Sequence, residues 1–302
     1  MTYQHLIDTA TAIGCGVTLQ APMSAATTFK VGGPADLLID LPDAAAASAV
    51  LAVCQSEEIP YLFIGNGSNL VVGDKGFRGA VLRLERSAQP TLLENGRLYA
   101  PAGMSLQRLC LFARDHSLTG LEFAYGIPGA VGGAVYMNAG AYDGEMAQVV
   151  VSADCVSADG TPLTLSADAL AMTYRHTALM ERDLIVVGAT LQLQPGDYDT
   201  IWAKMKDLMA RRHAKQPLEY PSAGSFFKRP TGYFAGKLIQ DAGLKGFTVG
   251  GAQVSEKHAG FVINRGGATA ADLVELRNQV HDKVFAEFGV HLEPEVRFVG
   301  EF

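Results

Sequence analysis

The chain has 302 residues, of which 48% are hydrophobic, so it is long enough for two or three domains with buried cores. Its formal net charge of −7 is uneven: residues 1–200 carry 10 Lys or Arg against 20 Asp or Glu, whereas residues 201–302 carry 14 against 11. This distribution argues against nucleic acid as the main partner and suits a small anionic ligand in the last third, although lysines on solvated helices explain the charge equally well.

The N-terminus and the cysteines bear on the location of the protein. Residues 1–14 have no basic segment followed by an apolar run, and no later segment approaches 18 uninterrupted apolar residues. Cys15, Cys54, Cys110 and Cys155 stand singly and far apart, which argues against a disulfide framework and against a zinc site. We therefore expect a cytoplasmic protein with no membrane contact and no bound metal.

In chain order, the first part of the sequence predicts strands with a few helices between them. Residues 2–13 predict a short helix, and a strand begins at Ala35. Asp43 can cap an alanine-rich helix that runs to about Glu58, and Ser105 can cap a helix that runs to about residue 116. Further strands are predicted at residues 61–64, 70–72, 80–84, 91–93 and 97–100.

The strand at residues 61–64 opens onto a loop of small, hydrogen-bonding residues. The loop consists of Gly65, Asn66, Gly67, Ser68 and Asn69. It can offer several N–H groups to a phosphate. The dinucleotide-binding fingerprint needs a helix after its glycine loop, whereas a strand follows here, so we do not expect the usual doubly wound nucleotide domain.

A second candidate loop lies in a glycine-dense stretch, residues 120–145. Seven of the 25 residues from Gly120 to Gly144 are glycine, and aromatic and aliphatic residues stand between them, unlike in a flexible linker. Such a backbone can approach a large cofactor closely and present N–H groups to it; the alternative is a set of tight turns in an all-β region. The candidate cofactor-binding residues here are Gly126, Pro128, Gly129, Gly132, Gly133, Asn138 and Gly140.

Strands predicted at residues 149–157, 162–165 and 184–193 complete an α+β pattern. The chain changes character at residues 195–197, and a helix with paired basic residues follows from about Tyr198 to Lys215, so we place a domain boundary there. Beyond it we expect helices at residues 234–242 and 270–288 and strands at residues 252–254, 261–263 and 291–299.

Seven separated motifs carry a family resemblance. They are TTFKVGGPADLLI, IGNGSNLVVGD, GIPGAVGGAVYMNAGAY, the pair Tyr174-Arg175, SAGSFFKRP, the run from Ala235 to Asn264, and LEPEVRFVGE. In this order the chain resembles the MurB family, the UDP-N-acetylenolpyruvoylglucosamine reductases, over essentially its whole length. The short connection between Leu193 and SAGSFF is similar to that of the compact subtype, which lacks the extra loop and tyrosine lid of the longer enzymes.

The resemblance implies a two-lobed FAD-binding domain of the vanillyl-alcohol oxidase type at residues 1–195, with the lobe boundary near residues 85–100. A smaller α+β substrate-binding domain is implied at residues 196–302. The implied activity is NADPH-dependent reduction of UDP-N-acetylglucosamine enolpyruvate to UDP-N-acetylmuramate through noncovalent FAD, in peptidoglycan synthesis and hence cell wall biogenesis, cell shape and cell division. We expect a monomer.

The resemblance also implies three catalytic residues. Arg175 would orient the substrate carboxylate and stabilise developing charge, Ser225 would protonate the second carbon, and Glu295 would lie beside the carboxylate. Taken alone, these residues have structural explanations: an arginine at a strand end, a turn hydroxyl and a solvent-facing carboxylate. The candidate substrate-binding residues are Tyr174, Lys215, Lys228, Arg229, Lys237 and Arg265.

Two other interpretations of the sequence compete with the reductase. Another flavin-dependent oxidoreductase of the same superfamily would often carry a histidine or cysteine for covalent flavin attachment, and the glycine motifs contain neither. A non-catalytic nucleotide-sugar binding protein would explain the basic last third but would leave both phosphate-type loops without a role. The colour of the purified protein distinguishes such a module from a flavoprotein.

Overall fold

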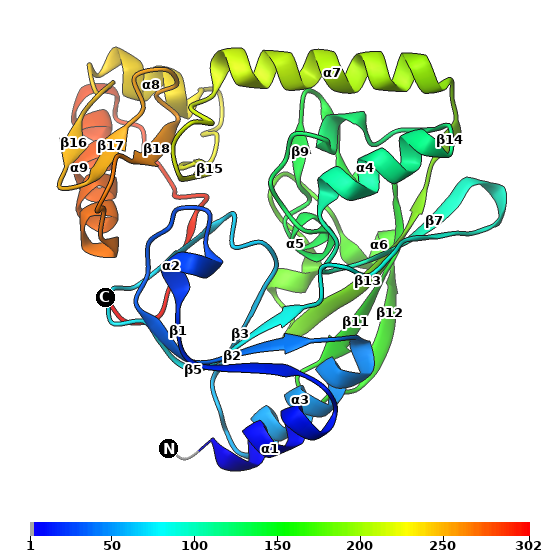
Figure 1. Ribbon diagram of the computed structural model, residues 1–302. Coiled ribbons are helices and arrows are strands. Elements are labelled where there is room, and N and C mark those ends of the chain that lie inside the picture. The colour runs from blue at the N-terminus through cyan, green and yellow to red at the C-terminus, as the bar shows by residue number, and fades with distance from the viewer. Residues whose placement is uncertain (1–2) are drawn as a thin grey trace. The chain divides into compact units, whose positions relative to one another are not determined.

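A computed structural model describes residues 3–302 (Figure 1). The chain forms two compact units that are each assembled from three segments. Unit 1 contains the described residues up to Leu19 together with Leu37–Asn66 and Gly79–Arg211, and unit 2 contains Gln20–Asp36, Gly67–Arg78 and Arg212–Phe302. The expected domain boundary between residues 195 and 196 remains a prediction.

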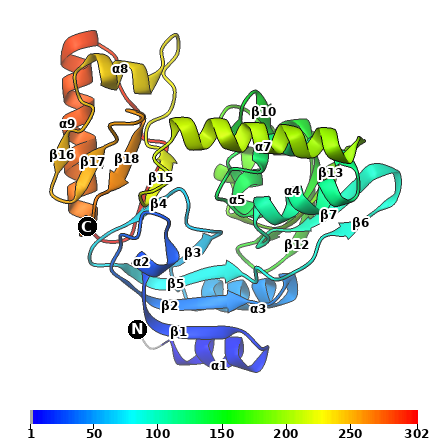
Figure 2. The same ribbon diagram turned by 45° about the horizontal axis from the view of Figure 1, so that its top comes forward.

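A four-stranded sheet lies at the start of unit 1. Its order is β1 (Gly16–Pro22), β2 (Pro34–Leu41), β5 (Phe77–Leu84) and β3 (Tyr61–Ile64), and some of these strands run past the limits of the unit. Helices α1 (Gln4–Ala12) and α3 (Ala44–Ser56) pack against each other beside this sheet (Figures 1 and 2). The predicted cap is confirmed, since the N–H of Ala46 donates to Oδ1 of Asp43 at 2.9 Å.

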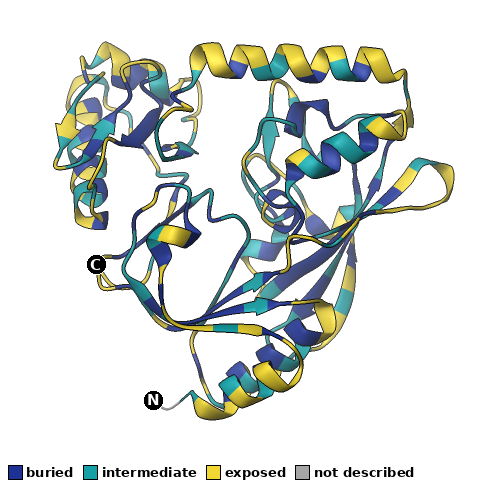
Figure 3. Ribbon diagram, in the orientation of Figure 1, coloured by how far each residue is buried: buried dark blue, intermediate teal, exposed yellow. Residues whose placement is uncertain are grey.

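A five-stranded antiparallel sheet forms the rest of unit 1. Its order is β12 (Pro162–Ser166), β11 (Val150–Ser157), β13 (Leu184–Gln192), β7 (Arg97–Pro101) and β6 (Thr91–Leu92). Helix α3 packs on β11, and α5 (Val131–Tyr136) packs on β13. Helix α4 (Leu106–Asp115) begins at the predicted cap, where the N–H of Arg108 donates to Oγ of Ser105 at 3.3 Å. The central strand β13 is buried along most of its length, and its neighbour β11 alternates buried with half-buried residues (Figure 3).

Short elements complete unit 1. They are β8 (Leu118–Thr119), β9 (Gly140–Ala141), β10 (Gly144–Glu145), α6 (Ala167–Leu170), β14 (Gln194–Pro195) and the 3₁₀ turns Glu94–Gly96, Glu122–Ala124, Met146–Gln148 and Ala178–Met180. Helix α7 (Tyr198–Lys215) has the predicted bounds and is exposed along most of its length (Figure 3). Its first turns pack in unit 1, where the guanidinium of Arg114 lies 4.6 Å from the ring centre of Trp202.

Unit 2 contains a four-stranded antiparallel sheet and two helices. The strand order is β15 (Ser222–Ser225), β18 (Phe261–Asn264), β17 (Ala252–Val254) and β16 (Thr248–Val249), with α8 (Ala235–Asp241) and α9 (Ala270–Phe288) packed together beside it. A short helix, α2 (Met23–Ala26), also belongs to this unit. Phe29 and Phe226 meet edge to face in its core, with ring centres 6.2 Å apart.

The C-terminal strand differs from the prediction. Only β19 (Arg297–Val299) is a strand, and it pairs in parallel with β4 (Leu70–Val72). The preceding residues bond elsewhere, because the N–H of Lys228 donates to the carbonyl of Glu293 at 2.8 Å and Pro294 has no N–H to donate. The predicted strand at residues 291–299 is therefore wrong for its first six residues.

Candidate active site

In unit 1 the structure brings the start of the first predicted phosphate loop against the second. Nδ2 of Asn66 donates to the carbonyl oxygen of Pro128 at 2.7 Å. A Cβ atom added to Gly65 would lie 3.1 Å from Cβ of Ala130, so the two main chains approach closely at this point. The glycine loops that the sequence predicted separately therefore adjoin in the folded unit.

The backbone around Gly133 fits a phosphate group. Gly133 is exposed at the beginning of α5, and a Cβ atom added there would meet no heavy atom within 4 Å. The N–H groups of Asn66 and Gly133 donate to no acceptor within residues 3–302. Gly132 differs, since its N–H donates to the carbonyl of Ala102 at 2.9 Å and an added Cβ would lie 2.8 Å from the Cβ of that residue. Gly132 thus serves packing, whereas Gly133 leaves a donor and open space.

The remainder of the first loop belongs to unit 2. Gly67 has a φ of +61°, and an added Cβ would lie 2.1 Å from the carbonyl oxygen of Ala26, so no other residue fits. The N–H of Thr28 donates to the carbonyl of Gly67 at 3.1 Å. These contacts hold the loop that also contains Ser68 and Asn69.

Arg175 is held in unit 1 by the end of the glycine-dense stretch. Its φ of +54° is a left-handed conformation that non-glycine residues seldom adopt. Nη1 donates to the carbonyl of Asn138 at 3.5 Å and Nη2 to the carbonyl of Gly140 at 3.2 Å. The guanidinium lies 5.3 Å from the ring centre of Tyr174, whose side chain is exposed.

Asn138, a predicted cofactor-binding residue, is fully buried and fixes this arrangement. Its Nδ2 donates to the carbonyl of Thr173 at 3.0 Å, and its Oδ1 accepts from the N–H of Ala147 at 2.9 Å. The side-chain amide therefore joins residues 138–147 to the segment that carries Arg175.

Ser225 and Glu295 lie in unit 2 on neighbouring segments. Ser225 is exposed at the end of β15, after a register shift in which Gly224 takes a φ of +76°. The N–H of the half-buried Glu295 donates to the carbonyl of Phe226 at 2.9 Å, so Glu295 adjoins the residue that follows Ser225. Two of the three predicted catalytic residues are thus brought together within one unit, while Arg175 belongs to the other.

The predicted diphosphate-binding cations of unit 2 have two kinds of partner. Lys228 pairs with Glu293, and Lys237 pairs with Asp241 at 2.7 Å. Lys215 is exposed at the end of α7.

The two arginines of this set instead lie on aromatic rings. The guanidinium of Arg229 is 3.9 Å from the ring centre of Phe234, and that of Arg265 is 4.7 Å from the ring centre of Tyr220 and donates to its hydroxyl. Phe234 is 59% exposed. Sequence reasoning missed both aromatic partners: Phe234 follows Arg229 by only five residues, whereas Tyr220 lies far from Arg265 in the sequence.

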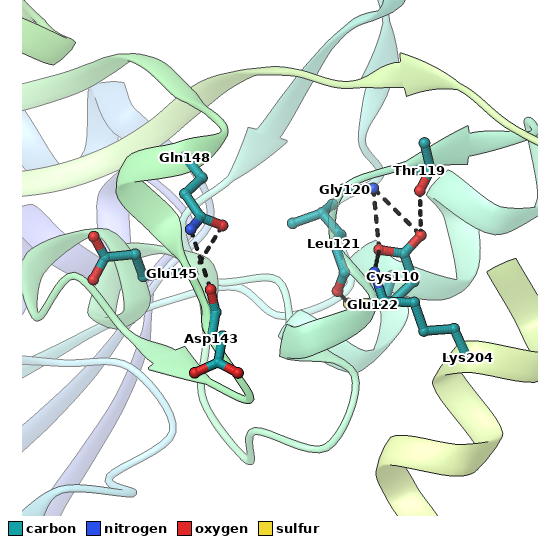
Figure 4. A network of polar contacts seen from close by, with 9 residues as sticks. All are labelled: Cys110, Thr119, Gly120, Leu121, Glu122, Asp143, Glu145, Gln148 and Lys204. Atoms are coloured by element: carbon teal, nitrogen blue, oxygen red, sulfur yellow. Dashed lines mark hydrogen bonds and ion pairs between the residues drawn. The ribbon is translucent and has the colours of Figure 1, made fainter.

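A buried carboxylate anchors the beginning of the glycine-dense stretch (Figure 4). Glu122 accepts from Oγ1 of Thr119 at 2.5 Å and from the N–H of Gly120 at 3.2 Å, and Nζ of Lys204 on α7 lies 3.5 Å away. Burial raises the pKa of Glu122, but these donors and the positive charge outweigh it and hold the pKa below its usual value. The ionised side chain therefore joins the stretch to α7.

Within residues 3–302, no helix is both long and apolar enough to span a membrane. The same residues contain no group of three or more His, Cys, Asp or Glu side chains that could hold a metal ion.

Comparison with known proteins covers nearly the whole chain. A family model of the FAD binding domain matches residues 35–166, and one described as UDP-N-acetylenolpyruvoylglucosamine reductase, C-terminal domain, matches residues 216–299. The UDP-N-acetylenolpyruvoylglucosamine reductase of Clostridium botulinum strain Hall is 50% identical over 285 residues, covering 94% of this chain and 93% of the relative. That of Agathobacter rectalis is 49% identical over 299 residues, covering 95% of each. The crystal structure of UDP-N-acetylenolpyruvylglucosamine reductase (MurB) from Thermus caldophilus matches with a TM-score of 0.79 and 35% identity, over 94% of this chain and 98% of that one.

Proposed function

This chain belongs to the family of UDP-N-acetylenolpyruvoylglucosamine reductases, and from that membership we propose that it reduces UDP-N-acetylglucosamine enolpyruvate to UDP-N-acetylmuramate with NADPH and FAD, in peptidoglycan synthesis. The observation that carries the proposal is 50% identity over 94% of the chain to a curated relative of that name. We further propose that the protein acts in the cytoplasm as a monomer, with an FAD-binding domain of the vanillyl-alcohol oxidase type.

Noncovalent FAD would be held by main-chain N–H groups rather than by basic side chains. The donors supported by the geometry are the main-chain N–H groups of Asn66 and Gly133. The fully buried Asn138 supports the site indirectly, through Arg175 and Thr173. The chemistry that bound FAD would supply is the transfer of a hydride from NADPH to the substrate.

Arg175 would stabilise the charge that forms on the substrate. A hydride added to the terminal carbon of an enolpyruvyl group pushes negative charge onto the neighbouring carbon and its carboxylate, so a fixed cation is needed there. The two carbonyl groups that accept from Arg175 set the plane of its guanidinium before substrate arrives. A guanidinium also remains charged when partly buried and can hold a carboxylate through parallel donors.

Ser225 would donate the proton that completes the reaction. A serine hydroxyl is a weak acid, but it can protonate a strongly basic carbon when it lies within hydrogen-bonding distance. Glu295, on the segment next to it, would lie beside the substrate carboxylate, so its protonation would be coupled to substrate binding. Tyr174, Lys215, Arg229 and Arg265 would bind the nucleotide sugar, while Lys228 and Lys237 would have to exchange their carboxylate partners for the diphosphate.

Stopped-flow absorbance tests this function. We expect NADPH to bleach the yellow protein under nitrogen, and the enolpyruvyl substrate to restore the colour. Colourless protein would indicate a binding module. Bleached protein that recovers with oxygen but not with the enolpyruvyl substrate would indicate another flavin-dependent oxidoreductase.

Ser225→Ala should separate the two half-reactions. Because Ser225 only protonates the product carbon in this proposal, NADPH should bleach the variant at a near wild-type rate. The return of colour with the enolpyruvyl substrate should slow by at least about 10²-fold. Equal slowing of both phases would instead mean that the substitution disturbs flavin placement.

A further inference from the structure

Asn69 ends the first predicted phosphate loop, and its side chain contacts the main chain of Glu295. Nδ2 of Asn69 donates to the carbonyl oxygen of Glu295 at 3.0 Å. The N–H of Arg297 donates to the carbonyl oxygen of Asn69, also at 3.0 Å. A carbonyl oxygen can only accept, so the amide must turn its nitrogen toward Glu295. Asn69 therefore holds residues 295–297 at two points, and all of these residues belong to unit 2.

Regular strand pairing stops just short of Glu295, which is why a side chain is needed there. The parallel pairing of β4 with β19 begins at Leu70 and Arg297. On its other side, Glu295 is bonded through its N–H to Phe226, and the residue before it is a proline without an N–H. The amide of Asn69 satisfies the Glu295 carbonyl at a position where a longer ladder would have used a main-chain donor.

We infer that Asn69 is a positioning residue that acts through Glu295 when the substrate is reduced. The inference rests on the proposed role of Glu295. The hydrogen bonds run from Asn69 to Glu295 and on to Phe226, so they also reach the neighbour of Ser225. Without the amide, the peptide group after Glu295 loses its donor and can rotate, which moves the carboxylate with respect to the serine hydroxyl. A misplacement of about 1 Å in such a constellation can cost about 10²-fold in rate.

This role differs from that of a flavin ligand, which the position of Asn69 in the loop would otherwise indicate. A flavin ligand affects FAD retention and the reduction of the flavin by NADPH. A residue that positions Glu295 affects the later step, in which the enolpyruvyl substrate takes up the hydride and a proton. The two half-reactions can be timed separately in one protein, so the two roles can be distinguished.

The first test compares Asn69→Ala, Asn69→Asp and Asn66→Ala by stopped flow, with FAD added to saturation. We expect both Asn69 variants to be bleached by NADPH at the wild-type rate and to recover colour about 10²-fold more slowly with the enolpyruvyl substrate. The aspartate keeps the shape of asparagine but faces the Glu295 carbonyl with an acceptor, so it should be at least as impaired as the alanine variant. Asn66 is the matched control, because its amide donates to Pro128 instead, and its loss should weaken FAD retention when the protein is purified without added FAD.

The second test asks whether Asn69 acts through Glu295. Adding Asn69→Ala to Glu295→Gln should slow the recovery of colour no further than Glu295→Gln alone. The pH profile should keep its shape in Asn69→Ala, which retains the carboxyl group, and should change in Glu295→Gln. Amide hydrogen exchange is measured for both proteins without substrate or NADPH. Residues 293–299 should exchange faster in Asn69→Ala than in the wild type, and this difference reports the lost hydrogen bond independently of activity.

Two results would overturn the inference but leave the proposed role of Glu295 intact. The first is a double variant whose loss of rate is the product of the two single losses. The second is an Asn69→Ala protein that recovers colour as fast as the wild type while Glu295→Gln is slow. A Glu295→Gln protein with normal kinetics at all pH values would overturn the proposed role of Glu295, and the inference with it.

Discussion

Gly132 and Gly133 are adjacent, yet the structure gives them different reasons to be glycine. A Cβ atom at Gly132 would press on Ala102, whereas one at Gly133 would stand in open space beside an N–H that no acceptor within residues 3–302 takes. The sequence alone treats the two as one motif. Their substitutions should therefore have separable effects, on packing at one position and on phosphate binding at the other.

Gly133→Val should yield a folded but colourless protein. The added Cβ atom would meet no heavy atom within 4 Å, and the valine side chain would occupy the space that the flavin diphosphate needs. Flavin absorbance and circular dichroism check this, with Ala45→Val as the matched control, since it adds the same bulk at an exposed position in the first turn of α3. Gly132→Val should instead lose about 1–3 kcal/mol of stability through overpacking. Full flavin in folded Gly133→Val would refute the assignment of this loop.

Arg175→Lys should slow the return of colour by roughly 10²–10³-fold, the loss typical of one preorganised donor in a reaction that develops charge. A single ammonium group cannot reach both carbonyl groups that Nη1 and Nη2 now contact. It also cannot bind a carboxylate through two parallel donors. Reduction by NADPH should be nearly unchanged. Arg182→Lys, an exposed substitution in the same unit, is the control and should be silent in both phases. A mild effect at Arg175 would make it a structural residue of the loop.

At the scale of elements, the sequence predicted correctly those helices and caps that depend on residues close together in the chain. The caps at Asp43 and Ser105 and the bounds of α7 and α9 are confirmed, because capping and helical periodicity are local properties. The strand at residues 291–299 is wrong over most of its length, because its partners are Phe226, Lys228 and Asn69, which lie far away in sequence. Helix α5 was not predicted, since its glycines disfavour a helix and packing on β13 overrides that preference.

The contact between the glycine-dense stretch and α7 should depend on pH through Glu122. Its folded pKa lies below the unfolded value, so its contribution to stability is complete above the ordinary glutamate pKa and is lost as pH falls through the folded pKa. Glu122→Gln should lower the free energy of unfolding by about 1–3 kcal/mol at pH 7. The difference in the free energy of unfolding between Glu122→Gln and the wild type should shrink below about pH 4.3.

Chemical unfolding at pH 7 and at pH 3.5 measures the Glu122 effect. Lys204→Met is the control for the ion pair, and because this lysine is largely exposed it should cost less than about 1 kcal/mol. A Glu122→Gln difference that stays constant across this pH range would mean that the carboxylate contributes no charge-dependent stability.

At the scale of the whole molecule, the family resemblance gave the function, but the sequence could not give the composition of the two units. Residues 20–36 and 67–78 belong to unit 2 although unit 1 residues flank them in the chain. Composition changes only near residue 195, where a boundary was expected, and no local signal marks the earlier crossings. The first phosphate loop was predicted as one segment, yet its residues divide between the units at Asn66 and Gly67.

Removal of FAD should lower the thermal stability of the protein in a manner that follows mass action. A cofactor that binds only the folded state, present at 1,000 times its dissociation constant, stabilises that state by about 4.1 kcal/mol. For a folding unit of about 150–250 residues, this stabilisation corresponds to a rise in Tm of roughly 8–16 °C. Calorimetry of the apoprotein over a series of FAD concentrations should show a Tm that climbs steadily with the logarithm of free FAD. Gly133→Val is the matched control, because its folded apoprotein should show the same starting Tm and no rise. A wild-type Tm that does not change with FAD would mean that the folded protein does not bind FAD, and an equal rise in Gly133→Val would place the cofactor away from the loop that contains Gly133.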